Sequence, residues 1–132
     1  MKDFKIGQES SISKAFTKKD VELFAQLSLD NNPVHLDENY AVNSIFKQPI
    51  VHGFLYASLI SATLGTKLPG PGSIYLHQEM NFKKPVYIGE EVTAKVIITD
   101  MNIEKSLVYL STTCFKNENE IVLEGKAIIK LI

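Results

Sequence analysis

Residues 28–41, SLDNNPVHLDENYA, place Asp30 and His35 on either side of a proline. Histidine is the usual group for proton transfer near neutral pH, and it works with a partner that orients it or handles a second proton. Residues five apart do not share a helix face. We therefore expect Asp30 at the end of a helix, with Pro33 turning the chain so that His35 returns towards it. Two side chains held in this way could grip one water molecule between them.

On this spacing alone, a structural interpretation is favoured over a catalytic one. In it Asp30 caps a turn and His35 is a hydrogen-bonded surface or core histidine, because polar clusters mark functional sites only probabilistically. In both interpretations Asn31 and Asn32 serve the turn, since asparagine tolerates unusual backbone angles.

A second histidine, His52, stands before Gly53 at the start of an apolar run, GFLYASLISATLG. The N-terminus of a helix presents unpaired N–H groups and partial positive charge, and glycine lets a ligand approach the backbone closely. Such a place suits an oxyanion, for instance a thioester carbonyl that gains enolate character. For His52 itself we expect a packing role that structures the turn.

The elements that position these residues fall into a helical first half and a strand-rich second half. Residues 9–16 form a candidate strand, and Thr17 with Asp20 forms a capping box at the start of a helix that stops before Pro33. One face of that helix is expected to be buried, widened on its flank by two leucines; the residues are Val21, Phe24, Ala25 and Ser28, with Leu23 and Leu27.

The remaining elements follow from apolar patterning. Residues 37–41 predict a helical turn capped by Asp37, and the run from Gly53 predicts a helix buried on every side and ended by Gly65 and Pro69. Four strands are expected within residues 73–82, 91–100, 105–115 and 121–131. The sequence thus predicts one domain over residues 1–132, of the α+β class, with an antiparallel sheet wrapped around a central helix.

Composition excludes several classes of protein. The chain has 132 residues, a net charge of −1 and all 14 basic residues as lysine, so no basic surface for nucleic acid is expected. Without arginine, carboxylates or phosphates must be bound by lysine or by backbone N–H groups. The single cysteine, Cys114, is expected to be a small buried hydrophobe. No signal peptide and no apolar run of about 18 residues is present, which predicts a cytoplasmic protein without a membrane span.

The motif D-N-N-P-V-H-L-D, followed by P-I-V-H-G, resembles the hydratase motif of MaoC-like, (R)-specific enoyl-CoA hydratases. The similarity extends through ASLIS, LPGPGSIYL, FKKPV and the final GKAIIK, and is greatest to short, single-domain hydratases that supply (R)-3-hydroxyacyl-CoA from β-oxidation intermediates. The resemblance implies a hot-dog fold that dimerises. It also implies reversible addition of water to a trans-2-enoyl-CoA without a metal or other cofactor.

The family pattern makes Asp30 and His35 the catalytic pair and the Gly53 N–H the oxyanion donor. Asn32 is expected to brace the loop, and Ser61 corresponds to a serine near the catalytic aspartate in close relatives. His35 is the expected base, and Asp30 the expected route for the proton at C2.

Further residues are candidates for contacts with the rest of the substrate. For each of them the alternative is a side chain that only packs in the core or lies on the solvated surface. Lys83 and Lys84 are candidates for the phosphates of coenzyme A. Leu64 and Ile128 are candidates for the acyl pocket. Tyr40 and Phe46 are candidates for covering the substrate.

Two rival functions remain open from the sequence. His35, Asp37 and His52 superficially fit the facial triad of non-haem iron oxygenases, although Asp37 is better placed as a helix cap. The second rival is a thioesterase or a non-catalytic acyl-CoA binder on the same fold, because fold does not fix function. The exposed sheet edge expected of such a protomer predicts a homodimer or a larger homo-oligomer.

Overall fold

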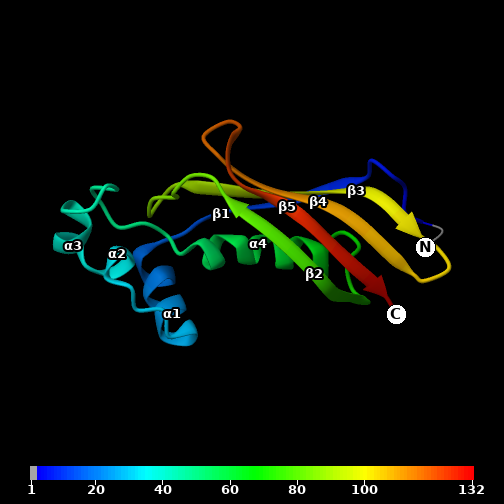
Figure 1. The fold of residues 1–132 in the computed structure, drawn as a ribbon, viewed down its shortest axis with the longest axis horizontal. Helices are drawn as coiled ribbons and strands as arrows, with labels where there is room; N and C mark the ends of the chain where they lie inside the picture. Colours follow the sequence, from blue (N-terminus) through cyan, green and yellow to red (C-terminus); the bar gives the residue numbers. More distant parts are fainter. Residues whose placement is uncertain (1–2) are drawn as a thin grey trace.

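The computed structural model describes residues 3–132, and Figure 1 shows a sheet with one long helix along it and three shorter helices gathered at one end. The strands are β1 Glu9–Ala15, β2 Ser73–Phe82, β3 Glu91–Asn102, β4 Leu107–Lys116 and β5 Glu120–Leu131. The helices are α1 Lys18–Ser28, α2 Pro33–Leu36, α3 Glu38–Val42 and α4 Gly53–Thr66. Each strand and the main helices predicted from the sequence are confirmed, with small shifts at their ends.

The sheet has the order β1-β3-β4-β5-β2, and every neighbouring pair is antiparallel. β1 and β2 are therefore the two edges. β2 is the strand that follows α4 in the chain, and it is bonded on one side only, to β5. The predicted antiparallel sheet is confirmed.

The core lies between α4 and the face of the sheet that packs against it. Tyr56, Ile60 and Leu64 of α4 are almost fully buried, together with alternate residues of β3 and β4 such as Val96 and Leu110. This alternation is expected when one face of a strand contacts a helix. Cys114 belongs to the same core, and burial raises the pKa of its thiol to about 12, so its predicted role as a buried hydrophobe is confirmed.

The prediction that α4 is buried on every side is wrong for the single chain. Phe54 is 66% exposed, and Ser58, Ser61 and Gly65 are exposed as well. Their spacing of four, three and four residues places them on one stripe of the helix. Gly65 also lies inside the helix, which ends at Thr66. Nothing in the local residue pattern indicates this stripe, because its residues are apolar or small.

α1 begins with the predicted capping box. Thr17 N–H donates to Asp20 Oδ2 at 2.9 Å, and Asp20 N–H donates to Thr17 Oγ1 at 3.1 Å. Its buried residues are Val21 and Ala25, whereas Leu23 and Leu27 are 48% and 84% exposed. The predicted wide buried face is therefore wrong: α1 lies with α2 and α3 at one end of the molecule (Figure 1), and only Val21 and Ala25 of it are buried.

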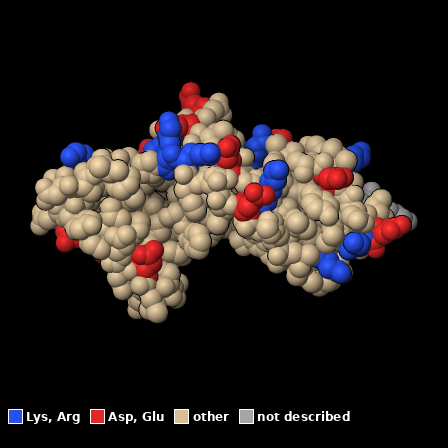
Figure 2. Space-filling model, in the orientation of Figure 1, with Lys and Arg blue, Asp and Glu red and all other residues tan. Residues whose placement is uncertain are grey.

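The surface carries mixed charge. On the face in Figure 2, lysine and acidic side chains lie beside one another over the strands, and the hollowed outline between α1 and β2 is mostly neutral. None of the helices in residues 3–132 combines the length and apolarity that a membrane span requires.

Candidate active site

The loop after α1 places Asp30. Leu29 caps the helix with a left-handed backbone, φ 68°, and Asp30 N–H then donates to Ser28 Oγ at 3.1 Å. Asp30 Oδ1 accepts from Asn32 N–H at 3.3 Å. The left-handed residue of this turn is Leu29, whereas the sequence predicts the unusual backbone angles at Asn31 and Asn32.

Asn32 and Pro33 start α2, the short helix that carries His35. Asn32 Oδ1 accepts from Val34 N–H at 3.2 Å, and Pro33 occupies the first turn, where its missing N–H costs nothing. His35 is 9% exposed, and its Nδ1 lies 2.8 Å from the carbonyl oxygen of Ile50. A carbonyl oxygen can only accept, so Nδ1 carries the proton and Nε2 keeps a free lone pair. The fold thus leaves the lone pair of His35 Nε2 available for a hydrogen bond or a proton.

His52 links the two halves of the motif. Its side chain is 1% exposed, its Nε2–H donates to the Asp30 carbonyl oxygen at 3.0 Å, and its ring stacks on His35 with centroids 3.8 Å apart. Burial lowers the pKa of His52, partly opposed by the hydrogen bond to Asp30. His52 Nδ1 has no hydrogen-bond partner within residues 3–132. A neutral, buried His52 that fixes the Asp30 backbone agrees with the structural role predicted for it.

This buried histidine predicts a pH dependence of stability. Because its folded pKa lies below the ordinary 6.5, the unfolded chain binds more protons than the native one just below that pH. The free energy of unfolding is expected to fall as pH drops below about 6.5, by no more than about 1.4 kcal/mol per pH unit. Denaturant titrations between pH 7.5 and 5 of wild type and His52→Phe measure it. The variant should show a flatter profile, and equal slopes would contradict the assignment.

Asp30, His35 and His52 form one cluster. One ligand atom of each lies within 4.8 Å of those of the other two. The predicted approach of Asp30 and His35 is thus present, and the gap between their polar atoms suits one bridging water. Asp37 is not part of the cluster, because its Oδ1 caps α3 by accepting from Tyr40 N–H at 3.1 Å.

A pocket of about 740 Å³ opens beside this cluster at the N-terminus of α4. Asp30, His52 and Gly53 line it, whereas His35 borders a separate hollow of about 210 Å³. Further walls come from aromatic and apolar residues for which the sequence predicts no pocket role, because nothing in their local pattern separates a pocket wall from core: Phe24, Ile50, Val51, Phe54, Tyr56, Phe82, Pro85 and Val86. A pocket of this size with mostly apolar walls suits a small organic ligand such as an acyl group.

Gly53 is the first residue of α4, so its N–H has no carbonyl one turn earlier to bond. A Cβ added here would lie 2.6 Å from Phe82 Cε1. The position thus combines a free backbone donor, the positive end of a 14-residue helix and a site where only hydrogen fits without moving the pocket wall.

The fainter candidates divide into those that the structure brings to the pocket and those that it does not. Lys83, Lys84 and Phe46 line it; Lys83 pairs with Glu124 at 3.6 Å and Lys84 with Glu120 at 3.0 Å. Tyr40 is 52% exposed on α3 and does not line it.

The remaining three candidates lie elsewhere in this chain. Leu64 is 1% exposed within the core, and Ser61 lies on the exposed stripe of α4. Ile128 lies between the core residues Ala127 and Ile129, so its side chain points to the opposite, outer face of β5. The structure therefore does not bring these three residues to the pocket within one chain.

A family model described as "MaoC like domain" matches residues 3–118. The chain belongs to the MaoC-like domain family. This MaoC-like chain is 48% identical, over 127 residues, to an (R)-specific enoyl-CoA hydratase of Rhodospirillum rubrum; the match covers 96% of the chain and 88% of the relative. It is 46% identical to the (R)-specific enoyl-CoA hydratase of Aeromonas caviae, with 96% and 94% covered.

Solved structures of similar proteins have the same fold as this chain. The (R)-hydratase from A. caviae involved in PHA biosynthesis superposes with a TM-score of 0.97 at 44% identity, over 100% of both chains. An R-hydratase from Pseudomonas aeruginosa gives 0.93 at 37% identity, covering 98% of this chain and 83% of that one. The MaoC-like chain therefore has the hot-dog fold, which confirms the α+β architecture that the resemblance implied.

Proposed function

We propose that the chain is an (R)-specific enoyl-CoA hydratase, which adds water reversibly to a trans-2-enoyl-CoA and gives the (R)-3-hydroxyacyl-CoA. The observation that carries the proposal is the cluster of Asp30 and His35, with polar atoms within 4.8 Å, beside the free N–H of Gly53. The relatives at 46–48% identity, which have this activity by name, support it.

In the proposed reaction, Asp30 and His35 hold the water beside C3 of the substrate. His35 Nε2 takes one proton of the water as its oxygen bonds to C3, since Nδ1–H is engaged by the Ile50 carbonyl. The proton that His35 takes passes to Asp30 and from Asp30 to C2. One O–H bond of water and the π bond between C2 and C3 are thus exchanged for a C–O bond and a C–H bond, and both side chains return to their starting states. Negative charge that passes to the thioester oxygen is stabilised by Gly53 N–H and the α4 dipole.

A thioesterase is the main alternative on this fold, and one assay separates the two activities. Purified protein is mixed with crotonyl-CoA and with the saturated butyryl-CoA, and free thiol is measured with a thiol reagent. We expect no thiol from either substrate, while crotonyl-CoA is consumed. Thiol release that keeps pace with loss of the thioester would replace the proposed hydratase with a thioesterase.

The proposed reaction needs no metal, although two histidines and a carboxylate lie together. The lone pair of an imidazole lies in the ring plane, and the rings of His35 and His52 are stacked with an interplanar angle of 26°. Stacked rings cannot both direct lone pairs at an ion about 2.0–2.1 Å from each nitrogen. We expect EDTA treatment to leave hydratase activity unchanged and elemental analysis to give far less than one ion per chain. Activity that is lost in EDTA and restored by one divalent ion would contradict this.

We also propose that the chain is a homodimer joined through β2. This edge strand exposes apolar side chains, with Ile74, Tyr75 and Leu76 at 40%, 41% and 53%, and the exposed stripe of α4 lies beside it. An apolar, unpaired edge is a template for pairing with a second copy. Light scattering should give twice 14.8 kDa for wild type. Leu76→Lys should shift the mass towards the monomer, whereas Ile103→Lys, at a 73% exposed apolar residue after β3, should not; an unchanged Leu76→Lys mass would contradict the interface.

The acyl-CoA substrate brings phosphates to the pocket mouth, where Lys83 and Lys84 are the proposed contacts. Their present partners, Glu124 and Glu120, are exposed or half-buried, and such surface ion pairs are weak enough to exchange easily. Ser61, Leu64 and Ile128 stay predictions for the substrate site, as does the cytoplasmic location.

A further inference from the structure

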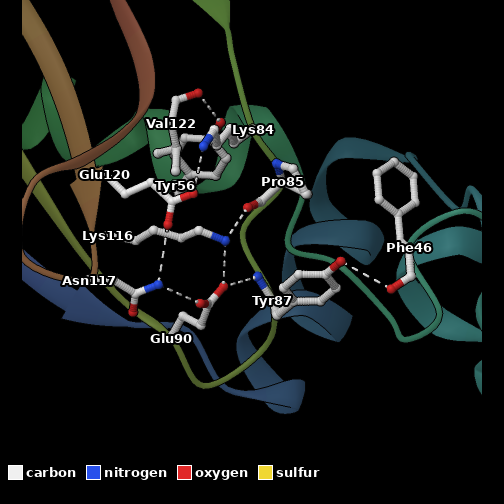
Figure 3. A network of polar contacts seen from close by, with 10 residues as sticks. All are labelled: Phe46, Tyr56, Lys84, Pro85, Tyr87, Glu90, Lys116, Asn117, Glu120 and Val122. Carbon is white, nitrogen blue, oxygen red and sulfur yellow. Dashed lines mark hydrogen bonds and ion pairs between the residues drawn. The ribbon is translucent and has the colours of Figure 1, made fainter.

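Lys116, the last residue of β4, carries a buried amine that is not part of the cluster of Asp30, His35 and His52. Its side chain is 7% exposed. The other buried polar side chains among residues 3–132 belong to two histidines and two threonines, so no carboxylate in this part of the chain is buried to the same degree. Its Nζ donates to the Pro85 carbonyl oxygen at 2.7 Å and pairs with Glu90 Oε1 at 3.1 Å (Figure 3). Burying an ammonium group costs free energy unless hydrogen bonds and an opposite charge replace its contacts with water. The contacts of Lys116 therefore show which part of the chain its side chain stabilises.

Those contacts all fall on the turn of residues 85–90 that follows β2. Glu90 Oε1, besides binding Lys116, accepts from Tyr87 N–H at 2.7 Å, and Asn117 Nδ2 lies 3.5 Å from Glu90 Oε2. Lys116 Nζ also lies 5.2 Å from the centroid of the Tyr87 ring. The ion pair therefore ties the 85–90 turn to the end of β4 at several points (Figure 3).

The 85–90 turn in turn holds the segment that enters the active site. Val51 N–H donates to the Val86 carbonyl oxygen at 2.7 Å, Tyr87 pairs with Ile50 in an antiparallel bridge, and Tyr87 Oη–H donates to the Phe46 carbonyl oxygen at 3.0 Å. The same segment contacts the proposed base, because the Ile50 carbonyl oxygen accepts from His35 Nδ1–H at 2.8 Å.

We infer that Lys116 and Glu90 are positioning residues for His35. Through the 85–90 turn they fix the Ile50 carbonyl, and this carbonyl fixes the tautomer and ring orientation in which His35 Nε2 is the base. The inference rests on the proposed function for its catalytic meaning, but the tautomer itself is a property of the folded chain. Lys116 does not line the 740 Å³ pocket, so it acts through the turn and not on the substrate.

The test compares Lys116→Met with the control Lys95→Met. The control removes a surface ion pair, 3.3 Å long, between Lys95 of β3 and Glu9 of β1. Two quantities are measured: the kcat and KM for crotonyl-CoA, and the tautomer of His35 from long-range proton–nitrogen NMR correlations of the imidazoles. In wild type and Lys95→Met, His35 should show the Nδ1–H form. In Lys116→Met we expect that form to be lost or exchange-broadened and kcat to fall about 10–100-fold, with KM changed much less, because misplacing a catalytic group by about 1 Å costs on this order.

The outcomes separate this inference from the proposed function. A folded Lys116→Met with a wild-type His35 spectrum and wild-type kcat overturns the inference. If Lys116→Met does not fold, Glu90→Gln, which removes the charge and keeps the shape, is measured in the same way, and an unchanged spectrum and kcat overturn it there. If wild type lacks hydratase activity, the proposed function fails, while the His35 spectra still decide whether Lys116 sets the tautomer.

Discussion

Replacing Asp30 or His35 by alanine is expected to lower kcat for enoyl-CoA hydration by about 10²–10⁴-fold, the range typical of a lost general acid or base. The physical reason is the geometry of the pair: their polar atoms lie within 4.8 Å, and the Ile50 carbonyl holds His35 with Nε2 free. Because the two side chains act on one water molecule, the double variant should lose little more than either single variant.

Two control variants accompany these substitutions. Asp30→Asn keeps an acceptor for the Asn32 N–H that Asp30 Oδ1 now binds, so it removes the charge with the least disturbance of the loop. Glu104→Ala, in the exposed turn after β3, removes a carboxylate far from the site and should keep wild-type kcat. A folded His35→Ala that retains wild-type kcat would rule out the proposed base.

Removing the N–H of Gly53 is expected to cost about 10²–10³-fold in kcat, as the loss of one oxyanion donor does elsewhere. Gly53→Pro achieves this at a position whose backbone accepts proline, and the added ring crowds Phe82 as any Cβ does there. Gly53 is the first residue of α4, and His52 before it has the extended backbone, φ −55° and ψ 135°, that proline requires.

Gly53→Ala is the matched control for that substitution. Both variants add a Cβ that crowds the Phe82 ring, but alanine keeps the N–H. The comparison therefore isolates the donor from the steric effect, with kcat for crotonyl-CoA as the measurement. Equal kcat values for the two variants would show that the N–H contributes nothing to the transition state.

Local sequence signals predicted much of the fold. The capping box at Thr17 and Asp20 depends on residues only three apart, and β-branched, alternating residues indicate the strands. Both features are therefore found where the sequence predicts them. The exposure of residues on the flanks of a helix depends on which other elements pack against it. The sequence therefore predicts buried side chains at Leu23, Leu27 and Phe54, which are exposed in the structure.

The candidate site shows the same division. The approach of Asp30 and His35 follows from one loop with one proline, and the sequence predicts it. The face on which Ile128 lies could not be predicted, because Ala127, Ile128 and Ile129 are all apolar and the alternation is lost. The role of Lys116 was hidden for another reason. Its partner Glu90 is 26 residues away, and nothing near Lys116 in sequence indicates that the side chain is buried.

Hydration of crotonyl-CoA by the purified wild-type chain is the measurement that tests the account most directly. Loss of the enoyl-thioester absorbance is followed, and the hydroxyacyl product is resolved by chiral chromatography. The Asp30, His35 and Gly53 site predicts rapid loss of absorbance and an (R)-3-hydroxybutyryl product. No loss with crotonyl-CoA or with a longer enoyl-CoA would contradict the hydratase function, and an (S) product would contradict the assigned stereochemistry.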